Sequence, residues 1–412
     1  MLTQEASGVP ILGLSCGNNH APTWSEAREL AHACAGPLGS VAVPLADSVG
    51  RALVLDVVAR QDIPHYASSA MDGWAVNGAG PWTLVEPGSQ LAPGEASLIA
   101  TGGLVPEGAA GILRKENGLG GGSLLNLRPG ITPDEILRGR HIRPAGEEAR
   151  AGDVLIPAGT VLNPAHVALA AVAGHDHVTV QRKPLVAVVL TGSEVVTSGE
   201  PAPGQVRDTF GPQLGTVISQ LGGEPGRQKR IGDSNADWLE ALADPDEGGR
   251  ADVTITTGGT GKSGTDHFRS AIAALGGDLL VDGIAMRPGH PAVLAGLPDG
   301  RFVIGLPGNP LAAMMALLTL GEPLLAALGN RRLSRCMHLT SGADFEPDPG
   351  RTRLVPCTFV QGLAVPASHT GPGMMRGLAR ADGFMAVPPG GVDAGEAVPV
   401  MPLPWTTQQG LS

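Results

Sequence analysis

The sequence predicts a multidomain α/β plus β protein: a three-layer α/β domain with a mostly parallel sheet, an inserted small β domain, a connecting mixed domain and a C-terminal β domain. The chain has 412 residues, more than one hydrophobic core normally supports. Residues 184–330 alternate near-continuous apolar strands with helical segments, a pattern typical of a parallel sheet covered on both faces. Short strand-like pieces between glycines and prolines fill residues 74–143 and 333–405, which indicates two further β domains.

Composition indicates a folded protein without a general affinity for polyanions. The 61 glycines and 36 prolines show no period and 42% of the residues are apolar, so we expect a turn-rich fold and not disorder. The formal net charge of -11 gives no attraction for nucleic acid or anionic lipid. Any phosphate site must therefore be local.

Cysteine spacing and apolar runs predict a cytoplasmic protein that does not enter membranes. The cysteines lack C-x-x-C spacing, so neither a zinc knuckle nor a disulfide framework is indicated. The longest apolar run begins at Leu311 and is interrupted by Glu322 and Pro323, short of the length that crosses a bilayer. The N-terminus has no basic region followed by an apolar one, so we do not interpret it as a signal peptide.

The expected domains follow from these changes of pattern along the chain. They are a loose N-terminus (1–21), a connecting domain (22–60 and 144–183), an inserted β domain (61–143), an α/β domain (184–330) and a C-terminal β domain (331–405).

Capping signals locate the helices of the connecting domain. Thr23 and Glu26 form a capping box before an amphipathic stretch. A short strand at residues 41–43 and a second helical piece at about 49–58 are expected next. Further on, Asn163-Pro164 supplies an N-cap and a first-turn proline for another helix.

The α/β domain contains predicted strands at LVAVVL, the run before Gly232, VTITT and FVIGL. Helices are expected near Pro212 to Leu221, Trp238 to Leu242, His267 to Leu275 and Leu311 to Leu328. Ligands of parallel sheets bind beyond the carboxyl ends of the strands, so the residues that follow each strand are the candidates for a site.

Glycines and acids follow these strands. The segments are Thr191-Gly192-Ser193-Glu194, Gly232-Asp233, Gly258-Gly259 through Gly264 and Asp266, and Leu306-Pro307-Gly308-Asn309-Pro310. Glycines let a phosphate approach the backbone, and Glu194, Asp233 and Asp266 provide the carboxylates that Mg²⁺ prefers together with water and substrate phosphates. The sequence therefore predicts a site for Mg²⁺ or another divalent metal and a phosphate-bearing ligand at this rim.

The glycine-rich turn after VTITT resembles two nucleotide motifs without matching either well. Gly259, Gly261 and Gly264 satisfy G-x-G-x-x-G, but a lone match deep in the chain is weak evidence for a dinucleotide site. Gly261-Lys262-Ser263 imitates the end of a P-loop, but Thr256 occupies the position of the first glycine.

Several candidates also have a purely structural interpretation. Asp233 and Asp266 could each cap the helix that follows. Thr101 could bind an oxyanion or close a turn. Arg287 and His290, in the stiff loop RPGHP, are more naturally interpreted as anion contacts.

Six motifs in order resemble the molybdopterin molybdenumtransferase family, which is related to the C-terminal part of gephyrin. They are SAMDGWAV, ATGGLVPEGA, AGEEARAGDVLIPAGT, LTGSEV, TTGGTGKSGTDHF and LPGNP, and the likeness covers the chain from Trp24 to about Pro402. The resemblance implies a homodimer that binds adenylated molybdopterin, incorporates molybdenum from molybdate with the help of a divalent metal, and releases AMP. It also implies exchange with the pterin-adenylylating protein and with recipient molybdoenzymes.

The resemblance assigns roles to particular positions. Glu194, Asp233 and Asp266 match acids that handle metal and substrate, and the remaining matches are assigned to substrate binding. These are Gly258, Gly259, Gly264, Pro307, Gly308, Asn309, Arg287, His290, Thr101, Ser69, Asp72, Glu148 and Asp208.

The chain also departs from the family pattern. Ala67 replaces a usual aspartate, His290 a usual lysine and Phe210 a usual asparagine. Loss of an acid and of a fixed positive charge weakens anion and metal binding. A catalytically weak relative that binds the pterin or hands over the cofactor is therefore the alternative function.

Overall fold

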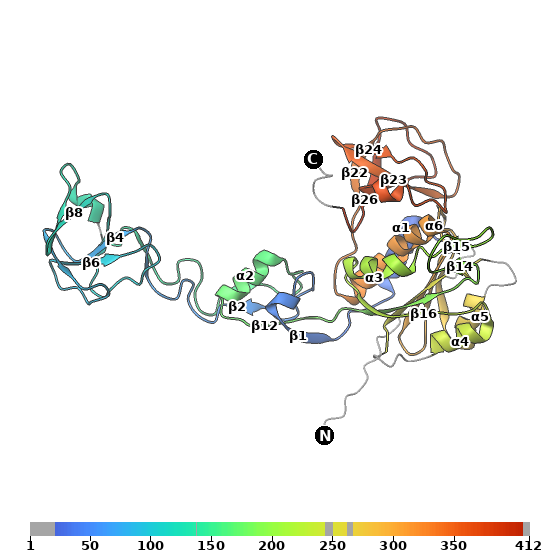
Figure 1. Ribbon diagram of the computed structural model, residues 1–412, viewed down its shortest axis with the longest axis horizontal. Helices are drawn as coiled ribbons and strands as arrows, with labels where there is room; N and C mark the ends of the chain where they lie inside the picture. The colour runs from blue at the N-terminus through green and yellow to red at the C-terminus, as the bar shows by residue number, and fades with distance from the viewer. Residues whose placement is uncertain (1–20, 137, 244–249, 262–266, 407–412) are drawn as a thin grey trace, which may run out of the picture. The chain divides into compact units, whose positions relative to one another are not determined.

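The computed structural model describes residues 21–136, 138–243, 250–261 and 267–406. The described chain forms two compact units (Figure 1). Of the described residues, the first contains 21–41, 50–52 and those from 181 to 406, and the second contains 42–49 and those from 53 to 180.

The first unit is built on a six-stranded sheet with the order β16-β13-β17-β21-β20-β18. Its strands are β13 (Leu185–Leu190), β16 (Glu224–Arg230), β17 (Val253–Thr257), β18 (Asp278–Asp282), β20 (Val293–Gly296) and β21 (Phe302–Leu306). The pairings from β16 to β21 are parallel, whereas β20 and β18 extend the sheet antiparallel. The predicted mostly parallel sheet is confirmed, and the antiparallel edge is an addition that the sequence pattern did not indicate.

Helices cover both faces of this sheet. They are α3 (Gly211–Gln220), α4 (Asn235–Ala243), α5 (His267–Ala274), α6 (Pro310–Ala316), the π-helical segment η3 (Leu317–Gly321) and α7 (Glu322–Leu328). On one face, β13, β17 and β21 pack against apolar side chains of α3, α6 and α7. On the other, Trp238 of α4 and Phe268 of α5 meet edge to face, with ring centroids 6.1 Å apart.

The segment Pro310–Leu328 is long and apolar enough to cross a membrane, but almost all of it is buried inside the protein. Glu322 and Pro323 do not interrupt it. Pro323 lies at the start of α7, directly after the π-helical segment η3, and the helix continues through it. This segment is the central core helix of the first unit.

Helix α1 (Trp24–Ala33) has the predicted capping box. The Thr23 side chain accepts a hydrogen bond from the Glu26 N–H, and the Glu26 side chain accepts one from the Thr23 N–H. It packs in the first unit: the Trp24 indole donates to Thr319 Oγ1 at 3.0 Å, and Trp24 meets the Phe384 ring edge to face at 6.2 Å. We expected α1 to belong with the connecting domain. An amphipathic pattern shows that a helix is half buried without indicating which core receives it.

A second six-stranded sheet in this unit has the order β19-β23-β24-β22-β26-β25, with β23 also paired to β25. Its strands are β19 (Met286–Arg287), β22 (Met337–Ser341), β23 (Thr352–Val360), β24 (Leu363–Pro366), β25 (Gly383–Val387) and β26 (Ala397–Pro402). A separate apolar core lies within it. The loop 368–377, between β24 and β25, contributes to the site described below.

The second unit contains a six-stranded sheet in the order β7-β4-β6-β5-β9-β8. Its strands are β4 (Gly73–Val76), β5 (Trp82–Val85), β6 (Glu95–Ile99), β7 (Gly111–Arg114), β8 (Gly118–Gly121) and β9 (Leu124–Leu127). The same unit contains α2 (Pro164–Val172), capped by Asn163 as predicted, and the pair β2 (Val57–Val58) and β11 (Val154–Ile156). Strand β1 (Ser40–Pro44) pairs with β12 (His177–Gln181).

The helix expected at about 49–58 is wrong. The segment contains turns and the short strand β2, and Leu53 bridges to Val180. Its apolar residues Leu53, Val54, Leu55, Val57 and Val58 satisfy the helical spacing by chance, because β-branched residues such as these valines fit a pleated pairing equally well.

Candidate active site

A cavity of about 910 Å³ lies at the carboxyl ends of β13, β17 and β21 in the first unit. Its size suits a ligand larger than a simple ion, since small-molecule sites typically enclose about 300–1,000 Å³. It is lined by Leu190, Thr191, Gly192, Glu194, Val195, Val206, Arg207, Asp208, Thr209, Phe210, Arg230, Asp233, Trp238, Thr257, Gly258, Gly259, Gly261, His267, Gly308, Asn309, Pro310 and Gly373.

The turn after β17 requires glycine for two independent reasons. Gly258 and Gly259 have φ angles of +80° and +66°, in the left-handed region that favours glycine. A Cβ at Gly258 would lie 2.7 Å from Thr191 Oγ1, and one at Gly259 would lie 2.6 Å from the Trp238 ring. The bare backbone therefore forms one wall of the cavity, and the Thr191 hydroxyl donates to the Thr257 carbonyl beneath it.

The acids Glu194 and Asp233 both line the cavity and are exposed to it. Asp233 Oδ2 accepts from the Ser193 N–H at 3.2 Å, which joins its loop to the turn that carries Glu194. Asp233 is not the cap of α4, because the Asp237 N–H donates to Ser234 Oγ. The third predicted acid, Asp266, lies outside the described residues, as does Gly264.

Metal binding was assigned to Glu194, Asp233 and Asp266 together. Within the described residues, no group of three or more His, Cys, Asp or Glu side chains is placed to hold a metal ion. Two exposed carboxylates on one wall nevertheless fit a Mg²⁺ ion of the kind that takes one or two carboxylates and completes its shell with water and substrate phosphates.

Asp208 lines the cavity, but its own bonds are structural. Its Oδ1 accepts from the N–H groups of Phe210 and Gly211 at 2.9 and 3.0 Å, at the start of α3. Its Oδ2 accepts from Arg230 Nη2 at 2.7 Å, and only 8% of the Asp208 side chain is exposed. Asp208 therefore holds Arg230 at the cavity wall.

The start of α6 is shared with the C-terminal β domain. The Pro372 carbonyl accepts from the N–H groups of Leu311 and Ala312 at 2.9 and 3.1 Å, so these two amides are not available to a phosphate. Asn309 is the N-cap residue of α6, but its side chain makes no capping hydrogen bond. The side-chain amide of Asn309 therefore remains at the cavity. Gly308 is exposed there, whereas Pro307 is buried and absent from the lining.

Arg287 and His290 do not line this cavity. The Arg287 side chain is 63% exposed, with an Asp348 carboxylate oxygen 4.0 Å away. His290 Nδ1 lies 2.7 Å from the Ile284 carbonyl, which can only accept, so Nδ1 carries a proton. The other ring nitrogen carries a second proton only when the imidazole is positively charged.

The remaining predicted residues lie in the second unit. Ser69 is fully buried, and its hydroxyl bonds to the Met71 carbonyl at 2.6 Å, a structural role. Asp72 accepts from both the backbone N–H and the hydroxyl of Thr101, at 2.7 and 2.9 Å. These bonds, the backbone bond first, hold the pKa of Asp72 below its ordinary value. Glu148 is exposed, and its N–H donates to the Ile63 carbonyl.

The basic residues of the cavity, Arg207, Arg230 and His267, were not among the residues selected from the sequence. Arg230 is the last residue of β16 and directly precedes the glycine and acid that were selected. His267 was assigned only to a helix.

A mostly parallel α/β sheet with a glycine turn, three carboxylates and three basic side chains around one cavity is typical of one class of protein: α/β proteins that bind an anionic small molecule. Models of known families agree. Residues 23–174 match the MoeA N-terminal region (domain I and II), residues 187–327 a probable molybdopterin binding domain, and residues 338–403 the MoeA C-terminal region (domain IV).

Whole proteins give the same result. A molybdopterin molybdenumtransferase of Nostoc sp. is 30% identical over 300 residues, 68% of this chain and 67% of the relative. The enzyme of that name from Staphylococcus aureus is 27% identical over 388 residues, 88% and 91% of the two chains. The crystal structure of a molybdopterin biosynthesis moeA protein from Pyrococcus horikosii has a TM-score of 0.73 at 28% identity, covering 93% of this chain and 99% of that one.

The chain belongs to the molybdopterin molybdenumtransferase family. The resemblance seen in the six sequence motifs is thus confirmed, together with the multidomain α/β plus β fold.

Proposed function

We propose that this protein inserts molybdenum from molybdate into adenylated molybdopterin and releases AMP. The observation that carries the proposal is the cavity at the strand ends, which combines bare glycine backbone, carboxylates and cations in a volume of about 910 Å³. That combination fits a ligand with both a polar ring system and phosphate groups. Family membership supplies the reaction.

Phosphate binding is assigned to the backbone at Gly258, Gly259 and Gly308 and to the cations Arg207 and Arg230. Because the chain as a whole carries a charge of -11, an anionic substrate depends on such a local group of cations. Arg230 is oriented by its bond to Asp208, so its guanidinium is pre-positioned at the wall. Asn309 and His267 are assigned to polar contacts with the rest of the ligand.

Glu194 and Asp233 are the residues that would hold a divalent metal, with Asp266 as a proposed third. When bound, such an ion neutralises phosphate charge and polarises a phosphorus–oxygen bond. The carboxylate of Asp233 keeps one oxygen on the Ser193 N–H, which fixes its direction. Within the part of the chain that the structure describes, its second oxygen has no hydrogen-bond partner, so it can face a ligand.

The loop of Arg287 and His290 is proposed as an anion contact outside the cavity. Arg287 provides a permanent charge, and His290 is positive only when both ring nitrogens are protonated, because Nδ1 is committed to Ile284. In the second unit, Asp72, Thr101, Ser69 and Glu148 remain proposed substrate-binding residues. The bonds of Asp72 to Thr101 favour a role in shaping the turn for Thr101.

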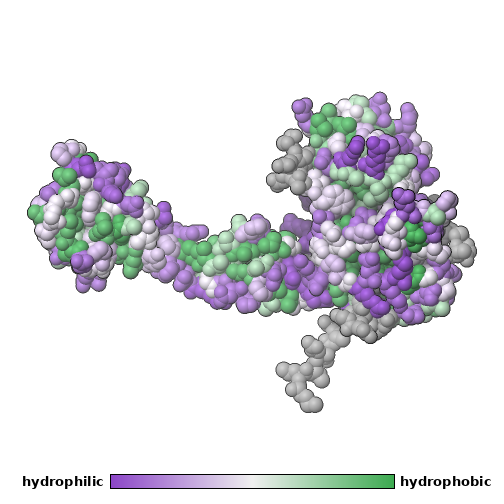
Figure 2. Space-filling view, viewed as in Figure 1, coloured by the Kyte–Doolittle hydropathy of each residue, from purple (hydrophilic) through white to green (hydrophobic). Residues whose placement is uncertain are grey.

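We also propose that the protein acts as a homodimer. Large apolar side chains are exposed in the second unit, and Figure 2 shows hydrophobic residues at the surface of the part that carries α2 and β2. Leu55, Val154 and Val172 are 61%, 55% and 54% exposed. Exposed apolar groups gathered in this way are typical of association surfaces. Light scattering on the purified protein tests this directly, since a monomer mass would contradict it.

The deciding experiment is release of AMP from adenylated molybdopterin on addition of molybdate and Mg²⁺, with the pterin product identified. Release that depends on molybdate is the expected result. Tight pterin binding without release would favour the scaffold function instead. A cytoplasmic location and exchange with the pterin-adenylylating protein and recipient molybdoenzymes are part of the same proposal.

A further inference from the structure

The guanidinium group of Arg269, in α5, joins three segments of the first unit that are separate in the sequence. Its Nη1 donates to the Thr260 carbonyl at 3.2 Å, and its Nε and Nη2 donate to Asp282 Oδ1 at 2.9 and 2.5 Å. Thr260 lies in the glycine turn after β17, and Asp282 ends the edge strand β18. In the described chain, none of these three residues lines the large cavity. Any effect of Arg269 on a ligand there must therefore pass through the turn.

Thr260 is the buried part of this turn. Only 2% of the residue is exposed, and a Cβ at Gly305 of β21 would lie 2.8 Å from Thr260 Cγ2, so the Thr260 methyl group packs directly on the sheet. Its carbonyl accepts from Arg269. The side chain and the carbonyl of Thr260 are thus both held, while its neighbours Gly259 and Gly261 line the cavity.

The turn offers N–H donors beside these held groups. The Gly258 N–H is used within the sheet, because it donates to the Leu306 carbonyl at 2.9 Å. Among the residues that the structure describes, the N–H groups of Gly259 and Gly261 have no hydrogen-bond partner. Successive backbone N–H groups in such a turn are suited to an anion.

One of these donors is oriented by Arg269. The Thr260 carbonyl and the Gly261 N–H belong to the same planar trans peptide group, so they point in opposite directions. A carbonyl held towards Arg269 therefore directs the Gly261 N–H away from it. Glycine has no Cβ to restrict rotation of this peptide group, so the bond from Arg269 supplies a restraint that the local sequence lacks.

We propose that Arg269 is a positioning residue for anion binding: it orients the Thr260–Gly261 peptide group so that the Gly261 N–H is a preorganised donor to a phosphate group in the cavity. The inference rests on the proposed function, since it takes the ligand of the cavity to carry phosphate. A guanidinium suits this role because its diverging donors serve a carbonyl and a carboxylate at once, whereas a lysine ammonium is a point charge on a flexible stem.

The test uses two measurements on the full chain: binding of AMP by isothermal titration calorimetry, and steady-state release of AMP from adenylated molybdopterin. Arg269→Gln should weaken AMP binding and raise KM by about tenfold or more, as for other lost hydrogen bonds to charged groups. Its kcat should change by less than about twofold, because the lost bond acts on bound substrate and transition state alike. Arg269→Lys keeps a positive charge opposite Asp282 and should recover part of the loss.

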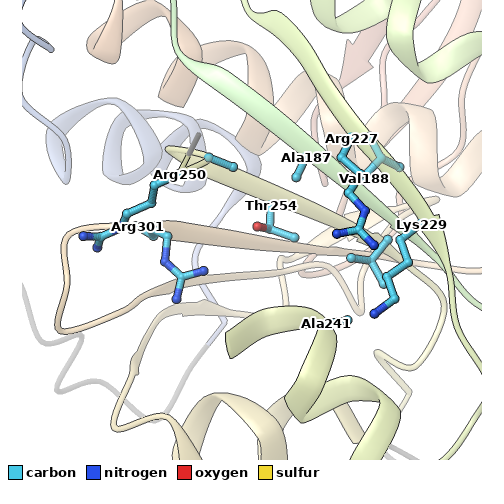
Figure 3. A pocket seen from close by; sticks show the side chains of 10 residues that line it. Ala187, Val188, Arg227, Lys229, Ala241, Arg250, Thr254 and Arg301 are labelled. Carbon is cyan, nitrogen blue, oxygen red and sulfur yellow. The ribbon is translucent and has the colours of Figure 1, made fainter. Parts of the chain in front are cut away.

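Arg301→Gln is the matched control. Arg301 also joins a carbonyl and an aspartate, since its Nη1 donates to the Leu242 carbonyl and its Nε to Asp299 Oδ2, each at 2.8 Å. Figure 3 shows Arg301 and Arg250 at a small pocket on the same sheet, whose lining shares no residue with the large cavity. Loss of Arg301 should lower the melting midpoint without changing AMP binding or KM.

Parental AMP affinity and KM in Arg269→Gln would overturn the proposal. So would equal losses in Arg301→Gln, which would indicate general destabilisation, and so would a fall in kcat at unchanged KM. If Arg269→Gln does not fold, as judged by circular dichroism, Asp282→Asn takes its place: it removes the charge that holds the guanidinium and should weaken AMP binding by about threefold.

The two measurements also separate this inference from the proposed function. A parent protein that binds AMP without releasing it from adenylated molybdopterin would refute the proposed reaction, and the comparison of AMP affinities would still decide the role of Arg269. A parent that releases AMP, with variants of unchanged KM, would refute the positioning role alone. A parent that does not bind AMP would overturn both.

Discussion

Replacing Gly259 with alanine should destabilise the first unit strongly. The backbone there has a φ angle of +66°, which costs an L-residue about 1 kcal/mol. The new Cβ would also lie 2.6 Å from Trp238, which is 1% exposed and packed against Phe268. Overpacking of that kind typically adds about 1–3 kcal/mol. We therefore expect a loss of about 2–4 kcal/mol in the free energy of unfolding.

Thermal unfolding followed by calorimetry measures the effect, and the midpoint should fall by about 5 °C or more. Gly390→Ala is the control for the loss of a glycine, because its φ is not positive and a Cβ there meets nothing within 4 Å. Gly308→Ala tests whether bare backbone at the cavity is needed for substrate binding. The new Cβ would be 4.0 Å from the nearest heavy atom, so the stability of the protein should be kept while its affinity for substrate falls. A Gly259→Ala protein as stable as Gly390→Ala would refute the account of this turn.

Three further outcomes are expected. Asp233 is exposed, and an asparagine there can still accept a hydrogen bond from the Ser193 N–H. Asp233→Asn should therefore leave the melting midpoint unchanged and lower the rate of AMP release by about tenfold or more. Full activity of this variant would remove Asp233 from the mechanism. Thr101→Val keeps the backbone bond to Asp72 and loses the hydroxyl bond, so the pKa of Asp72, lowered in the parent, should rise towards its ordinary value in an NMR titration. The contribution of these bonds to the free energy of unfolding is present above the pKa of Asp72 in the unfolded chain and is lost as the pH falls through its pKa in the folded protein. A pKa of Asp72 that is the same in Thr101→Val and in the parent would contradict the assignment. Burial raises the pKa of Cys34 and of Cys357 to about 12, so neither thiol should react with iodoacetamide at pH 8 until denaturant is added, and rapid labelling of the folded protein would show that these positions open.

Much of the α/β domain could be predicted because its elements are long and strongly periodic. The strands LVAVVL, VTITT and FVIGL are observed at β13, β17 and β21, and the residues after them meet around one cavity. The edge strand β18 and its neighbour β20 were missed; they lie between turns and join the sheet by antiparallel pairings that the pattern of strands alternating with helices did not indicate. The strand order that places β16 beside β13 depends on tertiary packing, which no local pattern contains.

The site was predicted less completely than the sheet. Glycines and acids at strand ends have a local signal, so Gly258, Gly259, Glu194 and Asp233 were found. Arg230 is held by Asp208 from another segment, and such a long-range pair has no signal in one sequence. Ser69 was selected from its motif alone, and the sequence did not indicate that its hydroxyl bonds to the Met71 carbonyl.

The Pro372 carbonyl on the first amides of α6 has a consequence for how variants of this protein should be interpreted. A loop between two strands of the C-terminal sheet completes the wall of a cavity that belongs to the α/β sheet. A truncation after residue 330, or a change that displaces residues 371–373, would therefore uncover two N–H groups beside the substrate. Loss of activity in such variants would report a rearranged pocket, and would not by itself assign chemistry to the C-terminal domain.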